Sequence, residues 1–433
     1  MSLYSSKIKC DIVDPANESQ NVRVEFRLNS GIGYYPTLRL GNFGSVGGDV
    51  EQNTAVGSLG LIRHVVLMNG TEEISKTRFA NRYQAFKIFN NTNDDNRDIN
   101  SSLYNCRQGY IFNDNLSVQP GGSPQNQQVV GDAVNVKASK ASSVNLMDLL
   151  PFLKSVPVLD TSLWTDLRVI VEYETSPSSW LNNNDAASST ISPYLIAEEI
   201  TDADLIKKLS ATFKSSIWNE IEHDQFHIGT QIPQANAVPV VQKIKQVING
   251  FDNKFVSRVV CMKTYSDKAE IKVDKAGAVN SSFGDFVSLA QHKEKINFVL
   301  NGKPVLPLDG LDTPAKKAMM LNDTWGTCNQ IPYGNVEGVG LDGRDAAVNK
   351  IGAPSLQTTR CGEDVGSQDF IGIMLESRIN QLEIDFERSV PEEDLADASC
   401  KVSKIGTGLD FHIYAEVRKM LTLENGRYIV SYV

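Results

Sequence analysis

Apolar and polar residues alternate with a period of two in short segments along the whole chain. These segments are rich in β-branched and aromatic residues and are bounded by Asn, Gly, Asp and Pro, which is typical of β-strands. The clearest are VRVEFRL (22–28), RHVVLM (63–68), DLRVIVEYE (166–174), KFVSRVVCMKTY (254–265), KINFVL (295–300), NQLEIDFE (380–387) and DFHIYAEVRKMLTL (410–423). Their number predicts an all-β protein of the sandwich type.

One of these strands runs into a tight turn, in the stretch SLGLIRHVVLMNGTEEI (58–74). Asn69 and Gly70 are expected to supply the positive φ angles of a hairpin turn. Val65 and Leu67 point to one side of the strand, and their neighbours Val66 and Met68 point to the other. Because all four are apolar, both faces of this strand are predicted to be covered.

Helical periodicity is confined to two segments. Residues 201–218 carry a start signal at Thr201 and Asp204. The apolar face of this predicted helix consists of Leu205, Leu209, Phe213 and Ile217. A second, shorter helix is expected over residues 144–153, ended by Pro151.

Long polar segments separate the strands, at 91–145, 175–193 and 303–367. Loops of such length are uncommon in compact domains, and they usually serve a function or an interaction. Disorder is the alternative, above all for residues 113–143.

The sequence also indicates an internal duplication. LMNG (67–70) matches VLNG (299–302) at an offset of 232 residues, and FNNT (89–92) matches LNDT (321–324) at the same offset. Two other pairings compete, of 61–68 with 255–262 at an offset of 194, and of 169–174 with 382–387 at an offset of 213. The matches predict two copies of one fold and leave the register open.

Composition and charge exclude several classes of protein. The 433 residues include 42 basic and 52 acidic side chains, and a net charge of −10 disfavours a surface for phosphate backbones. The six cysteines form no CxxC pair, so we expect buried reduced thiols. We see neither a cleavable apolar leader nor 18 consecutive apolar residues, and expect a soluble protein without a signal peptide or transmembrane segment.

The candidate catalytic and metal sites are weak. His223 and His227 form an HxxxH pattern that could share a metal if it were helical, but it lacks the adjacent Glu of metalloproteases. His64 and His412 lie in alternating segments, where a half-buried, hydrogen-bonded histidine is the ordinary expectation. Residues 340–350 resemble a calcium loop without its bidentate Glu. With no nucleophile elbow, dinucleotide fingerprint or P-loop, we assign no catalytic, cofactor-binding or metal-binding residue and expect no enzyme.

The stretch VGSLGLIRHVVLMNGTEEISKTRFANRYQAFKIFNN (56–91) resembles the double jelly-roll major capsid proteins of polinton-like viruses, adintoviruses and virophages. This lineage also includes adenovirus hexon and the giant-virus capsid proteins. Three further segments of the chain resemble segments of these capsid proteins, namely 145–174, 296–306 and 409–433. Residues 254–265 lack the Pro-Val-x-Glu-Leu-Ile-Trp sequence of the giant-virus proteins, which favours the polinton-like and virophage branch.

The resemblance implies an all-β fold of two tandem eight-stranded antiparallel jelly rolls with long loops and a few short helices. We expect a first roll at 1–200, a helical connector at 201–232 and a second roll at 233–433. The implied function is that of a major capsid protein in the virion of a DNA virus. Three chains would form a pseudo-hexagonal capsomer that tiles an icosahedral shell.

The implied partners are further copies of the chain, neighbouring capsomers, penton proteins and minor or cement proteins. Residues 1–20 would contact minor proteins or an internal membrane, and no direct sequence-specific binding of nucleic acid is expected. The alternative function is a carbohydrate-binding jelly roll, for which Trp180, Trp325 and Tyr333 would be the stacking platforms. Trp164 and Trp218 are expected in the core.

Overall fold

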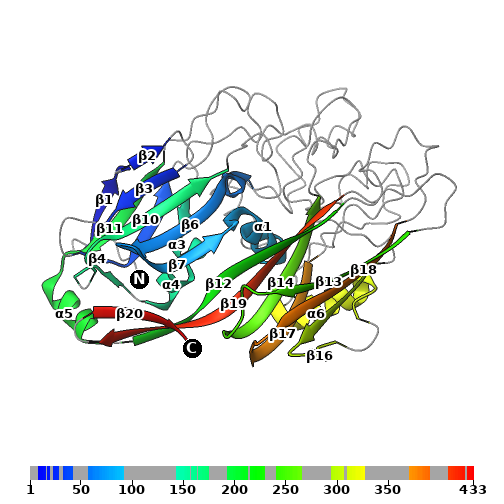
Figure 1. Cartoon of the computed structure of the whole chain (residues 1–433). Coiled ribbons are helices and arrows are strands. Elements are labelled where there is room, and N and C mark those ends of the chain that lie inside the picture. Colours follow the sequence, from blue (N-terminus) through cyan, green and yellow to red (C-terminus); the bar gives the residue numbers. More distant parts are fainter. Residues whose placement is uncertain are drawn as a thin grey trace, which may run out of the picture.

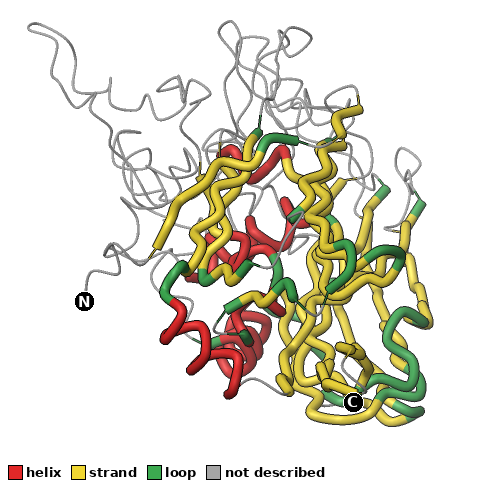
Figure 2. The backbone as a smooth tube through the Cα atoms, turned by 90° about the vertical axis from the view of Figure 1, so that its left-hand side faces the viewer, coloured by secondary structure: helices red, strands yellow, loops and turns green. Residues whose placement is uncertain are grey.

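The computed structural model consists mainly of β-strands, with a few short helices beside them (Figures 1 and 2). It describes residues 8–15, 17–19, 23–28, 33–41, 57–91, 143–156, 158–162, 164–174, 193–212, 215–229, 240–265, 294–306, 310–326, 370–390, 408–424 and 427–433. The predictions for residues 113–142 and for the calcium-like loop at 340–350 lie outside these ranges.

Two pairs of sheets divide the chain. The elements up to residue 212 are β1 (Ile8–Val13), β2 (Asn17–Ser19), β3 (Arg23–Arg27), β4 (Tyr34–Tyr35), β5 (Thr37–Gly41), the 3-10 helix η1 (Gly57–Leu61), β6 (Ile62–Asn69), β7 (Glu72–Arg78), α1 (Ala80–Asn91), β8 (Ser143–Asn145), α3 (Leu146–Leu149), α4 (Pro151–Ser155), β9 (Leu159–Asp160), β10 (Leu167–Tyr173), β11 (Tyr194–Ile200) and α5 (Ala203–Thr212). The later elements are β12 (Ser215–Ile228), β13 (Val240–Ile248), β14 (Phe255–Tyr265), β15 (Lys295–Leu300), β16 (Lys303–Pro304), α6 (Pro314–Trp325), β17 (Phe370–Arg378), β18 (Leu382–Val390), β19 (Leu409–Glu424) and β20 (Arg427–Tyr432).

Both pairs of sheets have the same strand order. The first pair is β1-β11-β5-β8 and β2-β3-β10-β6-β7, and the second is β12-β19-β14-β17 and β13-β18-β15-β16, with β20 paired to β19. If β2, β4 and β9 are set aside, eight strands can be counted in chain order in each pair of sheets. One sheet of each pair then joins strands one, eight, three and six, and the other joins strands two, seven, four and five. This is the jelly-roll order, and it occurs twice.

The equivalent strands decide the register of the duplication. β6 and β15 both precede an edge strand and pair with the seventh strand of their roll, so the offset of 232 residues is the correct one here. The 213-residue pairing also joins equivalent strands, β10 and β18. The 194-residue pairing is wrong because it joins β6 to β14, which lies in the other sheet of its roll between β19 and β17.

The two Asn-Gly turns perform the same structural task. Asn69 Oδ1 accepts the backbone N–H groups of residues 165–166 at 3.0 and 3.1 Å, and Asn301 Oδ1 accepts those of 380–381 at 2.9 and 3.0 Å. Each side chain thereby ties its hairpin to the start of the neighbouring strand. At the second turn both Asn301 and Gly302 have a positive φ angle (50° and 78°). At the first turn only Gly70 has one (59°), so the prediction for Asn69 is wrong.

The helix predicted over residues 201–218 is wrong beyond Thr212. α5 ends there, and β12 begins at Ser215, so Ile217 lies in a strand. β12 pairs with β19 along its whole length, and this long-range pairing outweighs the local helical periodicity. The predicted connector 201–232 is therefore helical only in its first part, and β12 is a strand of the second pair of sheets.

Pro151 begins a helix rather than ending one. α3 stops at Leu149, and Pro151 is the first residue of α4, where its missing N–H leaves no intrahelical hydrogen bond unmade. The apolar residues of this segment, Leu146, Leu149, Leu150, Phe152 and Leu153, are all buried. The segment is thus helical as expected, in two short pieces.

Two apolar cores hold the molecule together. One lies inside the second roll, between its two sheets. The other fills the first roll and continues into side chains of the later half of the chain, among them Trp218, Tyr414 and Tyr428. The two rolls therefore share a core where they meet.

Candidate functional site: the seam between the rolls

The rolls meet at a surface that we call the seam. On the side of the first roll it consists of edge strand β7 with helices α1 and α4, and on the other side of the outer face of β12 and β19 with β20 (Figure 1). Among the aromatic pairs that pack across it are Phe152 with Trp218 (ring centroids 5.1 Å apart), Trp164 with Tyr428 (4.8 Å), Tyr83 with Tyr414 (5.2 Å) and Phe86 with Phe370 (5.0 Å). The expected burial of Trp164 and Trp218 is confirmed.

The sequence of β19 explains why its sheet can be buried on both faces. Phe411, Ile413 and Ala415 point into the core of the second roll. The residues between them, His412 and Tyr414, point to the seam and are also buried. A sheet with two covered faces needs nearly continuous apolar strands, as seen here and in β14.

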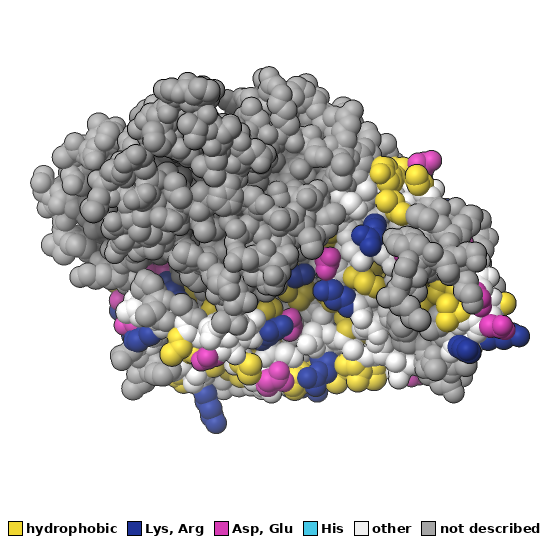
Figure 3. Space-filling model, turned by 180° about the vertical axis from the view of Figure 1, so that it is seen from behind, with side chains coloured by type: hydrophobic (Ala, Val, Ile, Leu, Met, Phe, Trp, Pro, Cys, Tyr) yellow, Lys and Arg dark blue, Asp and Glu magenta, His cyan; other side chains and the backbone are white. Residues whose placement is uncertain are grey.

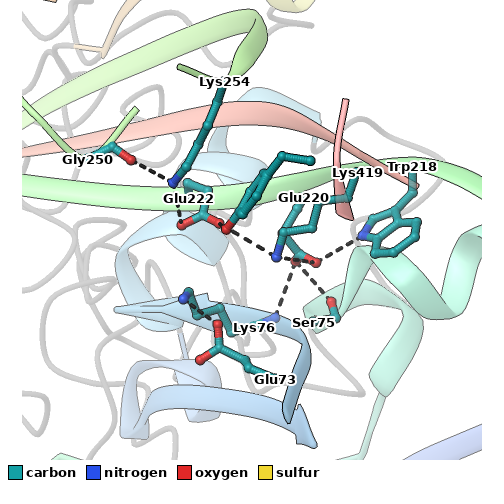
Figure 4. A network of polar contacts seen from close by, with 10 residues as sticks. Glu73, Ser75, Lys76, Trp218, Glu220, Glu222, Gly250, Lys254 and Lys419 are labelled. Carbon is teal, nitrogen blue, oxygen red and sulfur yellow. Dashed lines mark hydrogen bonds and ion pairs between the residues drawn. The ribbon is translucent and has the colours of Figure 1, made fainter. Parts of the chain in front are cut away.

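A buried carboxylate lies at one end of the seam (Figure 4). Glu220 on β12 is fully buried and accepts hydrogen bonds from the Ser75 hydroxyl at 2.9 Å, the Lys76 N–H at 3.3 Å and Trp218 Nε1 at 2.9 Å. Lys419 on β19 lies 3.8 Å from the same carboxylate. Since Ser75 and Lys76 belong to β7, Glu220 joins the two rolls by direct hydrogen bonds.

A second carboxylate extends this network within the second roll. Glu222 Oε1 accepts the Tyr432 hydroxyl at 2.8 Å and lies 3.6 Å from the ammonium group of Lys419, while Glu222 Oε2 lies 4.0 Å from that of Lys254. Lys254 also donates to the Gly250 carbonyl at 2.8 Å. The C-terminal strand is thereby tied to the seam (Figure 4).

The pKa values of these two carboxyl groups are shifted in opposite directions. Burial raises the pKa of Glu220 to about 7, against the opposing effect of Lys419. Burial also acts to raise the pKa of Glu222, but Lys419, Lys76 and Lys254 together outweigh it and hold that pKa below its ordinary value.

Phe79 occupies the middle of the seam. Its φ of 46° is unusual for a residue other than glycine, and it turns the chain from β7 into α1. The Tyr414 hydroxyl donates to its carbonyl at 2.9 Å across the seam. Its ring lies 5.1, 4.8 and 5.4 Å from the rings of His64, His223 and His412. Three of the five histidines in the chain thus surround one phenylalanine.

All three histidines are packing residues, and His64 and His223 are neutral at pH 7. His64 is half-buried and its Nδ1 accepts the N–H of Phe79 at 3.0 Å, as expected. Burial, followed by the charges of Arg63 and Arg78, lowers its pKa to about 4. His412 is fully rather than half buried, and its Nδ1 lies 3.1 Å from Nε2 of His223, whose pKa burial lowers well below the ordinary value.

The HxxxH pattern does not form a metal site of the kind that its spacing suggested. His223 and His227 lie on strand β12, where four residues span about 13 Å, too far for one ion. His227 instead contacts Asp410 at 2.9 Å. Among the residues that the structure describes, no group of three His, Cys, Asp or Glu side chains is placed to hold a metal.

The expected carbohydrate platforms receive no support. Trp180 and Tyr333 lie outside the described residues. Trp325 is half-buried, beneath Arg258, whose guanidinium carbon is 3.9 Å from the ring centroid, and against Phe86. It is therefore a seam residue rather than an exposed stacking surface.

Within the described part of the chain, none of the helices has the length and apolar character needed to cross a membrane.

No family model and no curated protein matches the sequence. Several solved structures match over nearly the whole chain, among them the following three. PBCV-1 VP54, as fitted into the virophage Sputnik, has a TM-score of 0.54 and 12% identity and covers 100% of this chain and 98% of its own. A chain of the Sputnik virophage structure has a TM-score of 0.53 and 9% identity, and the match covers 99% of this chain and 88% of that one. The Faustovirus major capsid protein has a TM-score of 0.50 and 9% identity, and the match covers 98% of this chain and 93% of that one.

The chain has the double jelly-roll fold. This confirms the fold class that the resemblance implied, and it rests on strand order as well as on the matches. The double jelly roll also explains the 232-residue repeat, because its two matches fall on the equivalent hairpins and on α1 and α6, the helices that follow them.

The Glu220 network was not predicted from the sequence. Trp218, Glu220 and Glu222 alternate along β12, and two acidic residues on one face of a strand ordinarily indicate a face in water. The weak signal was Trp218, an aromatic residue on that same face, which argues for burial. Phe79 carried no signal, since its role depends on its contacts with β12 and β19.

Proposed function

We propose that the chain is a major capsid protein that assembles into homotrimers, with a structural rather than an enzymatic role. The observation that carries this proposal is that two rolls of the same topology are joined through unlike surfaces. The first contributes an edge strand with helices, and the second contributes a sheet face. A contact between two unlike surfaces can be repeated from one copy to the next. The copies close into a ring if the rotation between neighbouring copies divides a full turn evenly.

Each roll keeps the counterpart of the surface that its neighbour uses. In the first roll, the outer face of β1-β11-β5-β8 corresponds to the seam face of the second, and no other described element covers it. Ile12 on this face is 66% exposed, beside its cross-strand partner Ile196. In the second roll, edge strand β16 is the counterpart of β7, and unlike β7 it is exposed. Met319 on the nearby α6 is 57% exposed.

A second copy can supply what each of these surfaces lacks. Within one chain, the first roll packs on the second roll. If the second roll of each chain packs in the same way on the first roll of the next chain, three chains give six rolls in a ring. Such a ring is a pseudo-hexagonal tile. The likeness of the fold to the Faustovirus major capsid protein supports this assignment.

The wider assembly follows from the same proposal. The tiles would pave an icosahedral virion, in contact with neighbouring capsomers, penton proteins and minor or cement proteins, and with an internal membrane where the virus has one. The described surface seen from behind mixes acidic, basic and apolar side chains instead of forming a basic face (Figure 3). This supports a role without direct sequence-specific nucleic acid binding.

The test combines solution mass and electron microscopy of the purified full-length protein. We expect a trimer with six-lobed particles, and we expect Ile12→Glu to give folded monomers because it places a charge in the proposed contact. Val241→Glu is the matched control, since Val241 is 51% exposed on β13, at the opposite edge of its sheet from β16. A wild-type protein that stays monomeric, or an Ile12→Glu variant that forms normal trimers, would contradict the proposal.

A further inference from the structure

A hollow of about 430 Å³ opens at the seam, on the outer face of the first roll. Strand β6 contributes Arg63, His64 and Val66 to its lining, β7 contributes Arg78, and β12 closes it with His223. The hollow therefore has walls from both rolls.

Two guanidinium groups in this hollow lack a counter-charge. No carboxylate of the described residues lies within ion-pair distance of Arg63 or Arg78, and the buried Nε of Arg63 has no hydrogen-bond acceptor among them. Arg63 only packs against Phe79, with its guanidinium carbon 5.2 Å from the ring centroid. Arg78 is exposed, with its head group free to turn toward a ligand.

The acidic residues of the lining form no ion pair with these arginines, and each contacts another group instead. The three pairs are Glu73 with Lys76, Glu172 with Arg23 at 3.7 Å, and Asp224 with the N–H of Gly250 at 3.0 Å. The lowered pKa of His64 is consistent with this, since Arg63, Arg78 and Arg82 act on it and no carboxylate appears among its main causes. The end of the hollow near His64 is thus positive.

His64 adds an oriented neutral donor. Its Nδ1 accepts the N–H of Phe79, so the neutral ring carries its proton on Nε2, which can donate to a ligand. On this wall of the hollow, two guanidinium groups and one imidazole N–H need acceptors, because the carboxylates of the lining already contact other groups. Tetrahedral oxyanions with several acceptor oxygens meet this need, and arginine binds phosphate oxygens in pairs.

We propose that this hollow binds a small phosphate-bearing anion, held by Arg63, Arg78 and His64 of the first roll against the wall that β12 of the second roll provides. The anion supplies the missing counter-charge, and because it contacts both sides it fastens the rolls together. The proposal concerns the single chain and does not depend on its assembly.

The test is calorimetric titration of inorganic phosphate into the full-length protein, with sodium chloride of equal ionic strength as the reference. We expect saturable binding, which Arg63→Gln and Arg78→Gln each weaken by about tenfold or more, because each removes a charged hydrogen-bond donor. Phosphate should also raise the thermal unfolding midpoint of the wild type by a few degrees and that of the variants by less.

Arg39→Gln is the matched control. Arg39 lies on β5, away from the hollow, with Glu198 at 4.0 Å, and its loss should leave phosphate binding unchanged. Since Arg78 is exposed, Arg78→Gln is expected to fold normally and decides the matter if Arg63→Gln does not. The absence of saturable binding, or an equal loss of affinity in Arg39→Gln and Arg78→Gln, would overturn the proposal.

Discussion

The two rolls share one strand order but differ in how much of each sheet is covered. In the second roll, the strands of β12-β19-β14-β17 have 14, 16, 11 and 9 residues, and the sheet is packed on one face against its own core and on the other against the seam. The equivalent strands of the first roll, β1, β11, β5 and β8, have 6, 7, 5 and 3 residues. Their outer face is not covered by other described elements.

The comparison shows that the two rolls share the same strand order, whereas the surroundings of their equivalent sheets differ. A sheet covered on both faces gains apolar burial from every residue, and long strands add to that gain. A sheet covered on one face gains it from alternate residues only. The seam is therefore where the two copies differ most, and variants there should have larger effects than variants on outer faces.

The largest effect is expected for Glu220→Ala. This variant leaves the Ser75 hydroxyl and the Trp218 N–H buried without their acceptor and removes one of the two carboxylates beside Lys419, and the free energy of unfolding should fall by about 3–5 kcal/mol. Urea unfolding followed by fluorescence measures the loss. Glu387→Ala is the control, because Glu387 pairs with Lys243 on the exposed face of β18, where such pairs contribute about 0–1 kcal/mol. Equal losses would refute the distinction between seam and outer face.

An intermediate effect is expected from pH, and two seam residues should act in opposite directions. The folded pKa of His64 (about 4) lies below its unfolded value of 6.5, so its contribution is present above pH 6.5 and is lost as the pH falls toward 4. The folded pKa of Glu220 (about 7) lies above 4.5, so its contribution is present below pH 4.5 and is lost as the pH rises toward 7. Each is worth on the order of 1–3 kcal/mol, with His64 at the low end because its ring is partly exposed.

Two variants separate these contributions in unfolding experiments between pH 4 and 7.5. His64→Asn keeps an acceptor for the Phe79 N–H but cannot titrate, so its stability should decline more steeply than that of the wild type as the pH rises. Glu220→Gln should decline less steeply. Parallel profiles for all three proteins would show that neither group controls the pH dependence.

The smallest effect concerns the two Asn-Gly turns and tests where the rolls remain alike. Asn69→Ala and Asn301→Ala each remove the acceptor of two backbone N–H groups at the protein surface, and this loss should cost about 1–2 kcal/mol. Asn301→Ala should cost about 1 kcal/mol more, because Asn301 has a φ of 50°, which alanine adopts less readily than asparagine. A much larger difference between the two variants would argue against equivalence of the two hairpins. Asn322→Ala, at an exposed position on α6, is the control and should cost less than about 0.5 kcal/mol.

The sequence predicted those features that depend on neighbouring residues in the chain. Alternation identified half of the strands with nine or more residues, namely β14, β18 and β19, and did not identify β12, β13 and β17. The repeated Leu-Asn-Gly and Met-Asn-Gly turns indicated the duplication, because alternation and turns are both local patterns. On β6, Val65 and Leu67 are buried as expected, while Val66 and Met68 are half-buried in the single chain. Cover for the second face by a neighbouring subunit stays a prediction.

The errors arose where distant segments decide the structure. β12 was taken for part of a helix because Leu205 to Ile217 repeats with helical spacing, whereas its pairing with β19 joins residues about 200 positions apart. Glu220 and Phe79 form the seam through partners from the other roll. A single sequence does not record which segment will supply those partners, so the fold was predictable and the seam was not.

The long pairing of β12 with β19 also has a mechanical consequence. In chain order, α5 at the end of the first roll is followed by β12 of the second. All 14 residues of β12 are paired with β19, over roughly 45 Å, so tension applied along β12 acts on this whole pairing. Lengthwise tension strains these hydrogen bonds together rather than one after another. A shell built from such chains would carry internal pressure as shear within a sheet, the direction in which paired strands resist force most strongly.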